Sequence, residues 1–160
     1  MAKIPVRITP DSSRFTAYLT FKLDLVKSEM LRGANLAYRR EFGLDVRSLR
    51  VLRAICDNPG VTSSGLRDLT LIEKTILSKV LADLIARKLI RRSIHPADAR
   101  HHQLWATPNG KSLREASDDL GHSMEDKMLS VLSRTEQSDL NRLLDKLASH
   151  FLANASQKNE

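Results

Sequence analysis

The sequence predicts a mainly α-helical fold with one small β-hairpin, and three observations support this. Apolar residues recur at helical spacing over most of the chain, in six regions that breaks or caps separate. One stretch, Leu89–Ile94, alternates apolar and polar residues as a half-buried strand does, and Gln103–Ala106 can pair with it. The 160 residues are 41% hydrophobic, which suffices for the core of a single domain spanning 1–160.

The first long helix is expected to begin at a cap on Asp11 or Ser12 and to run to about Arg40. Its apolar stripe contains Phe15, Leu19, Leu23, Val26, Met30, Ala34 and Ala37. A domain this small cannot cover so long a stripe. We therefore expect Phe15, Tyr18 and Leu19 to contact a second copy of the chain.

A second helix follows the break at Phe42-Gly43-Leu44. Asp45 can cap it, and Asn58-Pro59-Gly60 ends it after Asp57. We expect it to bury Leu49, Leu52 and Ile55.

Two further helices are predicted over residues 63–70 and 73–87. The shorter helix should direct Leu66 and Leu69 inward. The longer helix separates into two faces. Its apolar face carries Ile76, Leu77, Val80, Leu81 and Leu84, whereas its other face carries Lys74, Thr75, Ser78, Lys79, Ala82 and Ala86. A face with small side chains and two lysines can approach a polyanion closely, although an ordinary surface helix is the alternative.

Two helices followed by a basic two-stranded hairpin are the layout of a winged helix-turn-helix. The predicted hairpin tip, residues 95–102, is polar and places Arg100 among three histidines. In this layout the second helix of the pair enters the major groove of DNA, and the hairpin tip reaches the flanking backbone or the minor groove.

The stretch from about residue 46 to 115 resembles the MarR family of bacterial transcriptional regulators. The matching residues are Leu66 and Leu69, then Glu73–Lys79, then Asp98-Ala99-Arg100, then Ala106-Thr107-Pro108-Asn109-Gly110. The sequence departs from the family at Leu71 and Lys88, where the family often has glycine at positions that tend to need a positive φ. Ala106 also replaces the usual leucine.

The C-terminal third predicts two more helices. Thr107 can cap and Pro108 can open a helix through about Ser133, with Gly121 in its middle. Thr135 is expected to cap the last helix, whose stripe is Leu140, Leu143, Leu144, Leu147 and Phe151. The resemblance implies that residues 1–44 and 107–160 are dimerisation helices around a DNA-binding lobe, 45–106, with Leu140, Leu144, Leu147 and Phe151 in the dimer interface.

Charge and composition favour duplex DNA as the partner. The net charge is +7, with net +5 over residues 1–57, +4 over 58–106 and −2 over 107–160. A generic basic protein or a membrane-surface binder is the alternative. Aromatic residues are only 4% of the chain, which argues against binding of single strands by base stacking. One cysteine, Cys56, and the lack of a signal peptide or a membrane-spanning run predict a cytoplasmic protein.

The candidate DNA-binding residues follow from this layout. Thr62 and Ser63 lie at a helix N-terminus, where a phosphate can bind. Lys74, Thr75, Ser78 and Lys79 would face the major groove, and Arg92 lies on the basic hairpin. Arg100, extended by Asp98, can enter a narrow minor groove.

Other chemistry is less well supported by the sequence. The glycine-rich, nucleophile and zinc-protease motifs of common enzymes are missing, so we expect no catalysis and no cofactor. His95, His101 and His102 with Asp98 could form a zinc site, but a hairpin tip positions ligands poorly, and we predict no metal. Cys56 is expected to be a small core residue in preference to a redox switch.

The functional hypothesis is a homodimeric transcriptional repressor that binds a pseudo-palindromic site on double-stranded DNA. The resemblance implies a small-molecule effector such as an aromatic acid, and Tyr38, Phe42 and Arg53 could line its pocket. Two alternatives remain: a winged-helix protein-interaction module, and a nonspecific architectural DNA-binding protein.

Overall fold

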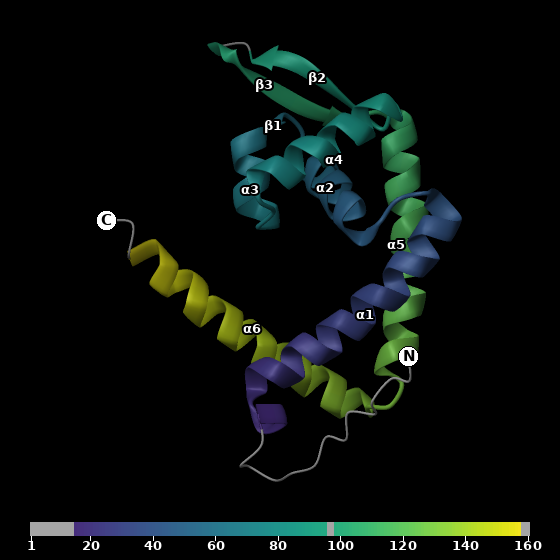
Figure 1. Ribbon diagram of the computed structural model, residues 1–160, viewed down its shortest axis with the longest axis vertical. Helices are drawn as coiled ribbons and strands as arrows, with labels where there is room; N and C mark the ends of the chain where they lie inside the picture. The colour runs from purple at the N-terminus through teal and green to yellow at the C-terminus, as the bar shows by residue number, and fades with distance from the viewer. Residues whose placement is uncertain (1–14, 96–97, 158–160) are drawn as a thin grey trace. The chain divides into compact units, whose positions relative to one another are not determined.

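The computed structural model describes residues 15–95 and 98–157, without the side chains of residues 95–101 and 154–157. Within these residues the chain is mostly helical with one three-stranded antiparallel sheet (Figure 1), which confirms the predicted fold class. The chain divides into two compact units, with the boundary between Gly121 and His122.

The N-terminal helix of the first unit starts later than predicted. A short 3₁₀ turn, η1 (Phe15–Ala17), precedes α1 (Leu19–Phe42), and Tyr18 between them has an extended backbone. The Phe15 ring packs edge-on against Phe21 with the ring centroids 4.9 Å apart. Because Tyr18 interrupts the helical backbone, the expectation of one continuous helix from Asp11 or Ser12 is wrong; those two residues themselves lie outside the described part.

The second helix, α2 (Val46–Asp57), forms the centre of the core. The Asp45 carboxylate accepts a hydrogen bond from the Ser48 N–H at 2.8 Å and so caps the helix as predicted. Leu49, Leu52 and Ile55 are fully buried, also as predicted. The preceding helix and the next two helices along the chain pack against this one.

The next helix, α3 (Ser63–Thr70), is capped by Thr62, whose Oγ1 accepts from the Gly65 N–H at 3.2 Å. Leu66 is buried, but Leu69 is 57% exposed, so the prediction that Leu69 points inward is wrong. The buried face of this short helix passes through Leu66 and Thr70, which lie one turn apart. Thr70 tolerates burial because its hydroxyl donates to the Leu66 carbonyl at 2.6 Å.

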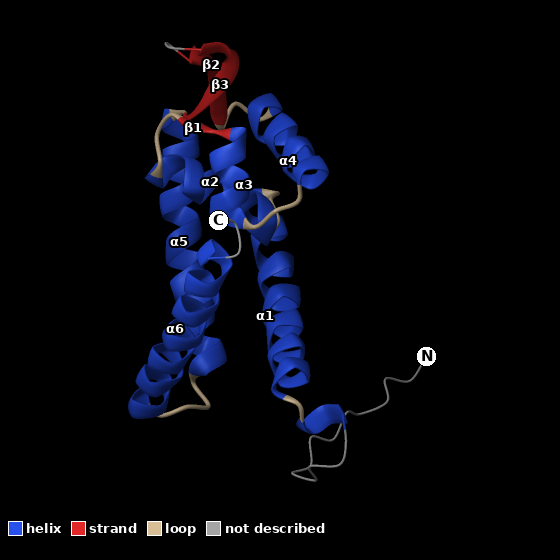
Figure 2. Cartoon of the chain, turned by 90° about the vertical axis from the view of Figure 1, so that its left-hand side faces the viewer, coloured by secondary structure: helices blue, strands red, loops and turns tan. Residues whose placement is uncertain are grey.

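The sheet contains a hairpin at the predicted place and one strand that the sequence analysis missed. The returning strand starts at Asp98 and not at Gln103, so the prediction of a tip over residues 95–102 is too long, because the strands pair further toward the turn than their apolar residues indicate. Strands β2 (Ile90–His95) and β3 (Asp98–Ala106) pair antiparallel, with Arg92 opposite Leu104. The additional strand β1 (Val61–Thr62) pairs with the other edge of β3. Two residues are too few for hydrophobic periodicity, so only the tertiary structure identifies this strand. Figure 2 shows α3 and α4 (Lys74–Ala86) at the same end of the unit as these strands.

Leu71 and Lys88, which stand where the MarR family often has glycine, both adopt left-handed backbone conformations. Leu71 has φ 55° and Lys88 has φ 57°, and they are the non-glycine residues with positive φ in the described part of the chain. Each conformation ends a helix, α3 at Leu71 and α4 just before Lys88. The structure therefore keeps the turns that glycine would provide, at a cost in backbone strain.

The contact between the start of α5 (Pro108–Leu129) and the residue before β2 requires a glycine. A Cβ on Gly110 would lie 2.1 Å from the Leu89 carbonyl oxygen. Beside it, the Thr107 hydroxyl donates to the Lys88 carbonyl at 2.8 Å and accepts from the Gly110 N–H at 3.1 Å. Thr107 thus caps α5 as predicted and also ties it to the residues that follow α4.

The second unit contains the end of α5 and α6 (Arg134–Gln157). α5 ends at Leu129, not near Ser133 as predicted. Ser133 caps α6, because its N–H and hydroxyl donate to the Glu136 carboxylate at 2.8 and 2.7 Å. The prediction of Thr135 as the cap is therefore wrong, since the reciprocal Ser–Glu pair starts the helix two residues earlier.

No helix in the described part of the chain is both long and apolar enough to cross a membrane.

Candidate nucleic-acid interface

The two faces of α4 lie largely as the sequence predicts, although Ile76 and Val80 of the apolar face are only half-buried. Leu77, Leu81 and Leu84 are buried, with exposures of 3%, 2% and 0%. The opposite face is exposed and carries Lys74, Thr75, Ser78, Lys79, Ala82 and Ala86. This helix therefore presents a narrow, cationic surface of small side chains to solvent.

Two hydroxyl groups of this face are already engaged within the helix. The Thr75 hydroxyl donates to the Glu73 carboxylate, and the Thr75 N–H donates to Glu73 Oε1 at 3.3 Å. These hydrogen bonds from Thr75 lower the pKa of Glu73. The Ser78 hydroxyl donates to the Lys74 carbonyl at 2.9 Å. In this arrangement both hydroxyls can still accept hydrogen bonds, while the two lysines remain available as donors.

A hollow of about 520 Å³ lies beside this face. Residues from α3, α4 and the sheet line it: Thr62, Ser63, Ser64, Arg67, Lys74, Leu77, Ser78, Leu81, Arg92 and His102. Five of the predicted DNA-binding residues, Thr62, Ser63, Lys74, Ser78 and Arg92, thus come together around one concavity. Thr75 and Lys79 lie on the exposed face of α4 but are not part of this lining.

The structure adds Ser64, Arg67 and His102 to the site. The sequence carried a signal for Ser64 and Arg67, because both lie in the helix that Thr62 caps. His102 could not be placed from the sequence. It joins the lining because β3 pairs with β2 in the register that sets His102 opposite Ile94.

The hairpin is described only in part. The backbones of Asp98 and Arg100 belong to β3, but their side chains, like those of His95 and His101, lie outside the described residues. Their predicted roles therefore stay predictions. On the sheet face away from Arg92, Arg91 stacks over Trp105 with 5.5 Å between the guanidinium carbon and the ring centroid, and Trp105 Nε1 donates to Ser93 at 2.9 Å.

A second hollow, of about 500 Å³, lies between α1, the start of α2 and the turn from α3 to α4. Its lining combines basic, acidic and aliphatic side chains: Lys27, Leu31, Asn35, Arg39, Asp45, Val46, Arg47, Arg50, Leu71, Ile72, Glu73 and Ile76. One of the four cations is paired, because Arg39 lies 3.6 Å from the Asp45 carboxylate. The sequence analysis missed this site, since its residues come from three separate segments.

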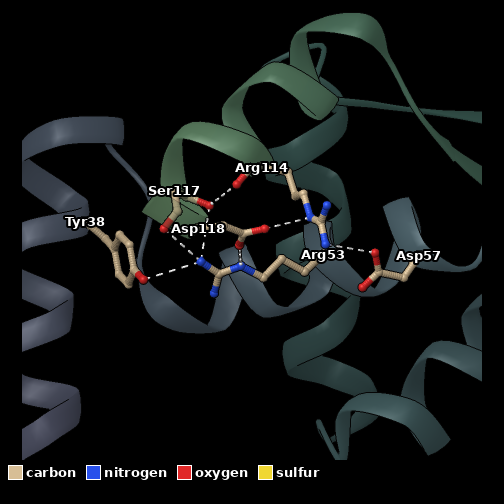
Figure 3. A network of polar contacts seen from close by, with 6 residues as sticks. All are labelled: Tyr38, Arg53, Asp57, Arg114, Ser117 and Asp118. Carbon is tan, nitrogen blue, oxygen red and sulfur yellow. Dashed lines mark hydrogen bonds and ion pairs between the residues drawn. The ribbon is translucent and has the colours of Figure 1, made fainter. Parts of the chain in front are cut away.

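Tyr38, Phe42 and Arg53, the predicted effector residues, lie elsewhere. The Tyr38 and Phe42 rings are neighbours with centroids 6.2 Å apart. Arg53 contacts Tyr38 and two residues of α5 in a polar network (Figure 3). Cys56, on the same helix as Arg53, is half-buried, and burial raises the pKa of its thiol, which lowers the thiolate fraction available for redox chemistry.

Comparisons with known proteins place the chain in a family. The model of the MarR family matches residues 42–101. The transcriptional regulator HosA from Escherichia coli O111:H- is 34% identical over 97 residues, which cover 61% of this chain and 72% of HosA. The chain belongs to the MarR family. It is a MarR family transcriptional regulator, and the comparisons agree with the expectation from sequence that it is not an enzyme.

Solved MarR-type structures have the same fold. Bordetella bronchiseptica BpsR, whose DNA binding is regulated by 6-hydroxynicotinic acid, matches with a TM-score of 0.77 and 22% identity, over 84% of this chain and 96% of BpsR. The S. aureus MepR–DNA complex matches with a TM-score of 0.73 and 22% identity, over 84% of this chain and 98% of MepR. At these identities the likeness concerns the fold alone.

Proposed function

We propose that this MarR family regulator is a ligand-responsive homodimeric repressor that binds a pseudo-palindromic operator. The observation that carries the proposal is the exposed cationic face of α4, which borders a hollow lined by Thr62, Ser63 and Arg92. A major groove about 12 Å wide admits one α-helix whose outward side chains are small.

Each part of this surface has a role in the proposal. The N-terminus of α3, with Thr62 and Ser63, binds a backbone phosphate through its free N–H groups. Lys74 and Lys79 contact guanine edges or phosphates. The Ser78 hydroxyl accepts a hydrogen bond from a base, directly or through a water molecule. Arg92 contacts the backbone beside the groove, and Arg100, positioned by Asp98, enters the adjacent minor groove.

Two exposed apolar surfaces support the homodimer. In the first unit, Phe15, Tyr18 and Leu19 are all exposed at the start of α1. In the second unit, Leu140, Leu144, Leu147 and Phe151 form an exposed row along α6. Apolar rows of this length are costly to leave in water, and a second copy covers them without any other partner. A dimer then directs two α4 helices toward successive major grooves, about 34–36 Å apart.

The hollow at the turn before α4 is the site that we propose for the effector. Lys27, Arg47 and Arg50 form no direct ion pair among the described residues, although the charge of Arg47 also acts on Asp45. The three cations can bind a carboxylate, while Leu31, Ile72 and Ile76 provide an aliphatic wall. An aromatic acid has both parts. Because Leu71 and Glu73 line the same hollow and precede α4, an occupant would bias the orientation of that helix. The earlier assignment to Tyr38, Phe42 and Arg53 remains the competing prediction.

The test begins with DNA fragments selected from genomic DNA by the purified protein. Fluorescence anisotropy should give at least about a thousandfold preference for a selected fragment over a scrambled duplex at physiological salt. Equal affinity for both duplexes would indicate an architectural protein, and no binding to either would indicate a protein-interaction module. Benzoate-type acids should weaken operator binding in the native protein and not in Arg47→Ala; an unchanged response in that variant would exclude the hollow.

A further inference from the structure

Gly121 lies where α5 passes Tyr38 of α1, and this contact leaves no room for a side chain. A Cβ on Gly121 would lie 2.7 Å from the Tyr38 hydroxyl oxygen. Glycine within a helix is about 1 kcal/mol less favourable than alanine. Gly33, within α1, is different because a Cβ there would meet no atom within 4 Å. The glycine in α5 is therefore explained by the Tyr38 hydroxyl, which reaches this position from α1.

The side chain of Tyr38 is held in this position by α2. Tyr38 is 4% exposed, and its hydroxyl accepts a hydrogen bond from Arg53 Nη2 at 3.4 Å. The same nitrogen donates to the Ser117 carbonyl at 3.0 Å, and Arg53 Nε donates to Asp118 at 2.5 Å. One guanidinium of α2 thus joins α1 to α5 (Figure 3).

A second guanidinium, from α5 itself, also contacts α2 and shares the Asp118 carboxylate with Arg53. Arg114 Nε lies 3.0 Å from Asp118 Oδ2, and Arg114 Nη2 donates to Asp57 at 3.1 Å. Two arginines therefore balance two aspartates in one half-buried cluster. Partly buried charge pairs are sensitive to geometry, because small displacements leave a desolvated charge without its partner. The cluster consequently restrains the angle between α1, α2 and α5.

We infer that the Gly121–Tyr38–Arg53–Asp118 joint selects the half-site spacing of the operator. This inference rests on the proposed dimeric operator binding. The 19 residue steps from Tyr38 to Leu19 make α1 a lever of about 28 Å. A tilt of ~7° at the joint moves the far end by about 3.4 Å, which is the rise of one base pair. Since Leu19 is at the proposed dimer interface, the joint angle translates into the separation of the two α4 helices.

The test measures the affinity of the protein for three operators. Their half-sites are separated by the native number of base pairs, by one base pair fewer, or by one base pair more. Gly121→Ala forces α5 away from the Tyr38 hydroxyl and should reduce affinity for the native spacing about tenfold, while affinity for one altered spacing is retained or improved. Tyr38→Phe removes the atom that the new methyl group meets. The double variant Tyr38→Phe/Gly121→Ala should therefore recover the spacing profile of Tyr38→Phe. Gly33→Ala is the matched control and should leave the profile unchanged.

A second measurement reports the joint without DNA. Spin labels at Lys22→Cys and Lys79→Cys, in a Cys56→Ser background diluted with unlabelled protein, give a distance between α1 and α4 within one chain. Gly121→Ala should shift this distance and Gly33→Ala should not. If Gly121→Ala does not fold, Tyr38→Phe alone should broaden the distance distribution because the hydrogen bond to Arg53 is lost.

The outcomes separate the two proposals. The proposed role of the joint would be overturned if Gly121→Ala changed neither the spacing profile nor the label distance. It would also be overturned if the double variant did not recover the spacing profile of Tyr38→Phe. A wild-type protein with no preference for half-site spacing would instead overturn the proposed operator binding, and the label distance would then decide on the joint by itself.

Discussion

The helices α4 and α6 both present a long exposed face, but the two faces differ in chemistry. On α4 the leucines are buried, and the exposed residues are small or cationic. On α6 the leucines themselves are exposed, from 37% at Leu140 to 65% at Leu152. Exposure alone therefore identifies neither surface.

The difference indicates two kinds of partner. Lysines with small neighbours favour a polyanion, because they attract phosphates and leave room for close approach. Exposed leucines favour an apolar partner, because burial contributes about 25 cal/mol for each Å² removed from water. We therefore propose DNA for α4 and a second copy for α6, and the two surfaces can be disrupted separately.

The largest effect is expected from a charge in the apolar row of α6. Leu144→Asp should weaken dimerisation by more than about 2 kcal/mol, because the proposed interface would bury an unpaired carboxylate. Ser149→Asp places the same charge on the opposite side of the helix and serves as the control. Sedimentation equilibrium measures both. An intact Leu144→Asp dimer would remove α6 from the interface.

The next effect concerns the cationic face of α4. Lys74→Ala and Lys79→Ala should each weaken operator binding by about 1–3 kcal/mol if they contact bases, or reduce the salt dependence by about one phosphate contact if they contact the backbone. Anisotropy titrations at several salt concentrations distinguish these cases. Lys146→Ala, on α6, should change neither quantity; an equal effect there would mean that the positive charge acts without regard to position.

A smaller effect is expected at the cap of α2, on which the buried side of α4 depends. Burial by itself raises the pKa of Asp45, but hydrogen bonds from Ser48 and the charge of Arg39 outweigh it, and the pKa is lowered. The cap therefore stabilises the fold above the ordinary carboxyl pKa, and its contribution is lost as the pH falls through the lowered value.

Asp45→Ala should accordingly cost about 1 kcal/mol in the free energy of unfolding at neutral pH, and less in acid. Asp45→Asn keeps a capping oxygen and should therefore lower the free energy of unfolding at neutral pH by less than Asp45→Ala does. Urea unfolding at several pH values measures the difference. A cost for Asp45→Ala that grows on acidification would contradict the assigned role.

The smallest effect is a stabilisation next to α4. Leu71 is 85% exposed and has φ 55°, a conformation that costs a non-glycine residue about 1–2 kcal/mol. Glycine removes this strain but gains entropy in the unfolded state, so Leu71→Gly should stabilise the protein by about 0.5 kcal/mol. Thermal unfolding measures it. The reverse change at another left-handed position, Gly43→Ala, should destabilise, and the same sign for both would contradict this explanation.

The sequence predicted the helices well where a cap and an apolar period coincide. Asp45 with Leu49, Leu52 and Ile55 gave α2, and Thr107 with Pro108 gave the start of α5. The sequence analysis misplaced the cap of α6, because Ser133 and Glu136 bond each other and start the helix before Thr135. It also misplaced the buried face of α3, where Thr70 is buried and Leu69 is exposed. No pattern in the sequence near β3 indicates its register with β2, so the position of His102 could not be predicted.

The sequence by itself determined the order of the helices and the two faces of α4, whereas the left-handed positions at Leu71 and Lys88 were expected only from the resemblance to the MarR family. These follow from side-chain periodicity and backbone sterics, which act within a few residues. Only the tertiary structure decided that β1 joins the sheet, that Arg53 links Tyr38 to Asp118, and that Gly121 admits the Tyr38 hydroxyl. Those contacts join residues far apart in the chain, and packing, not local preference, selects them.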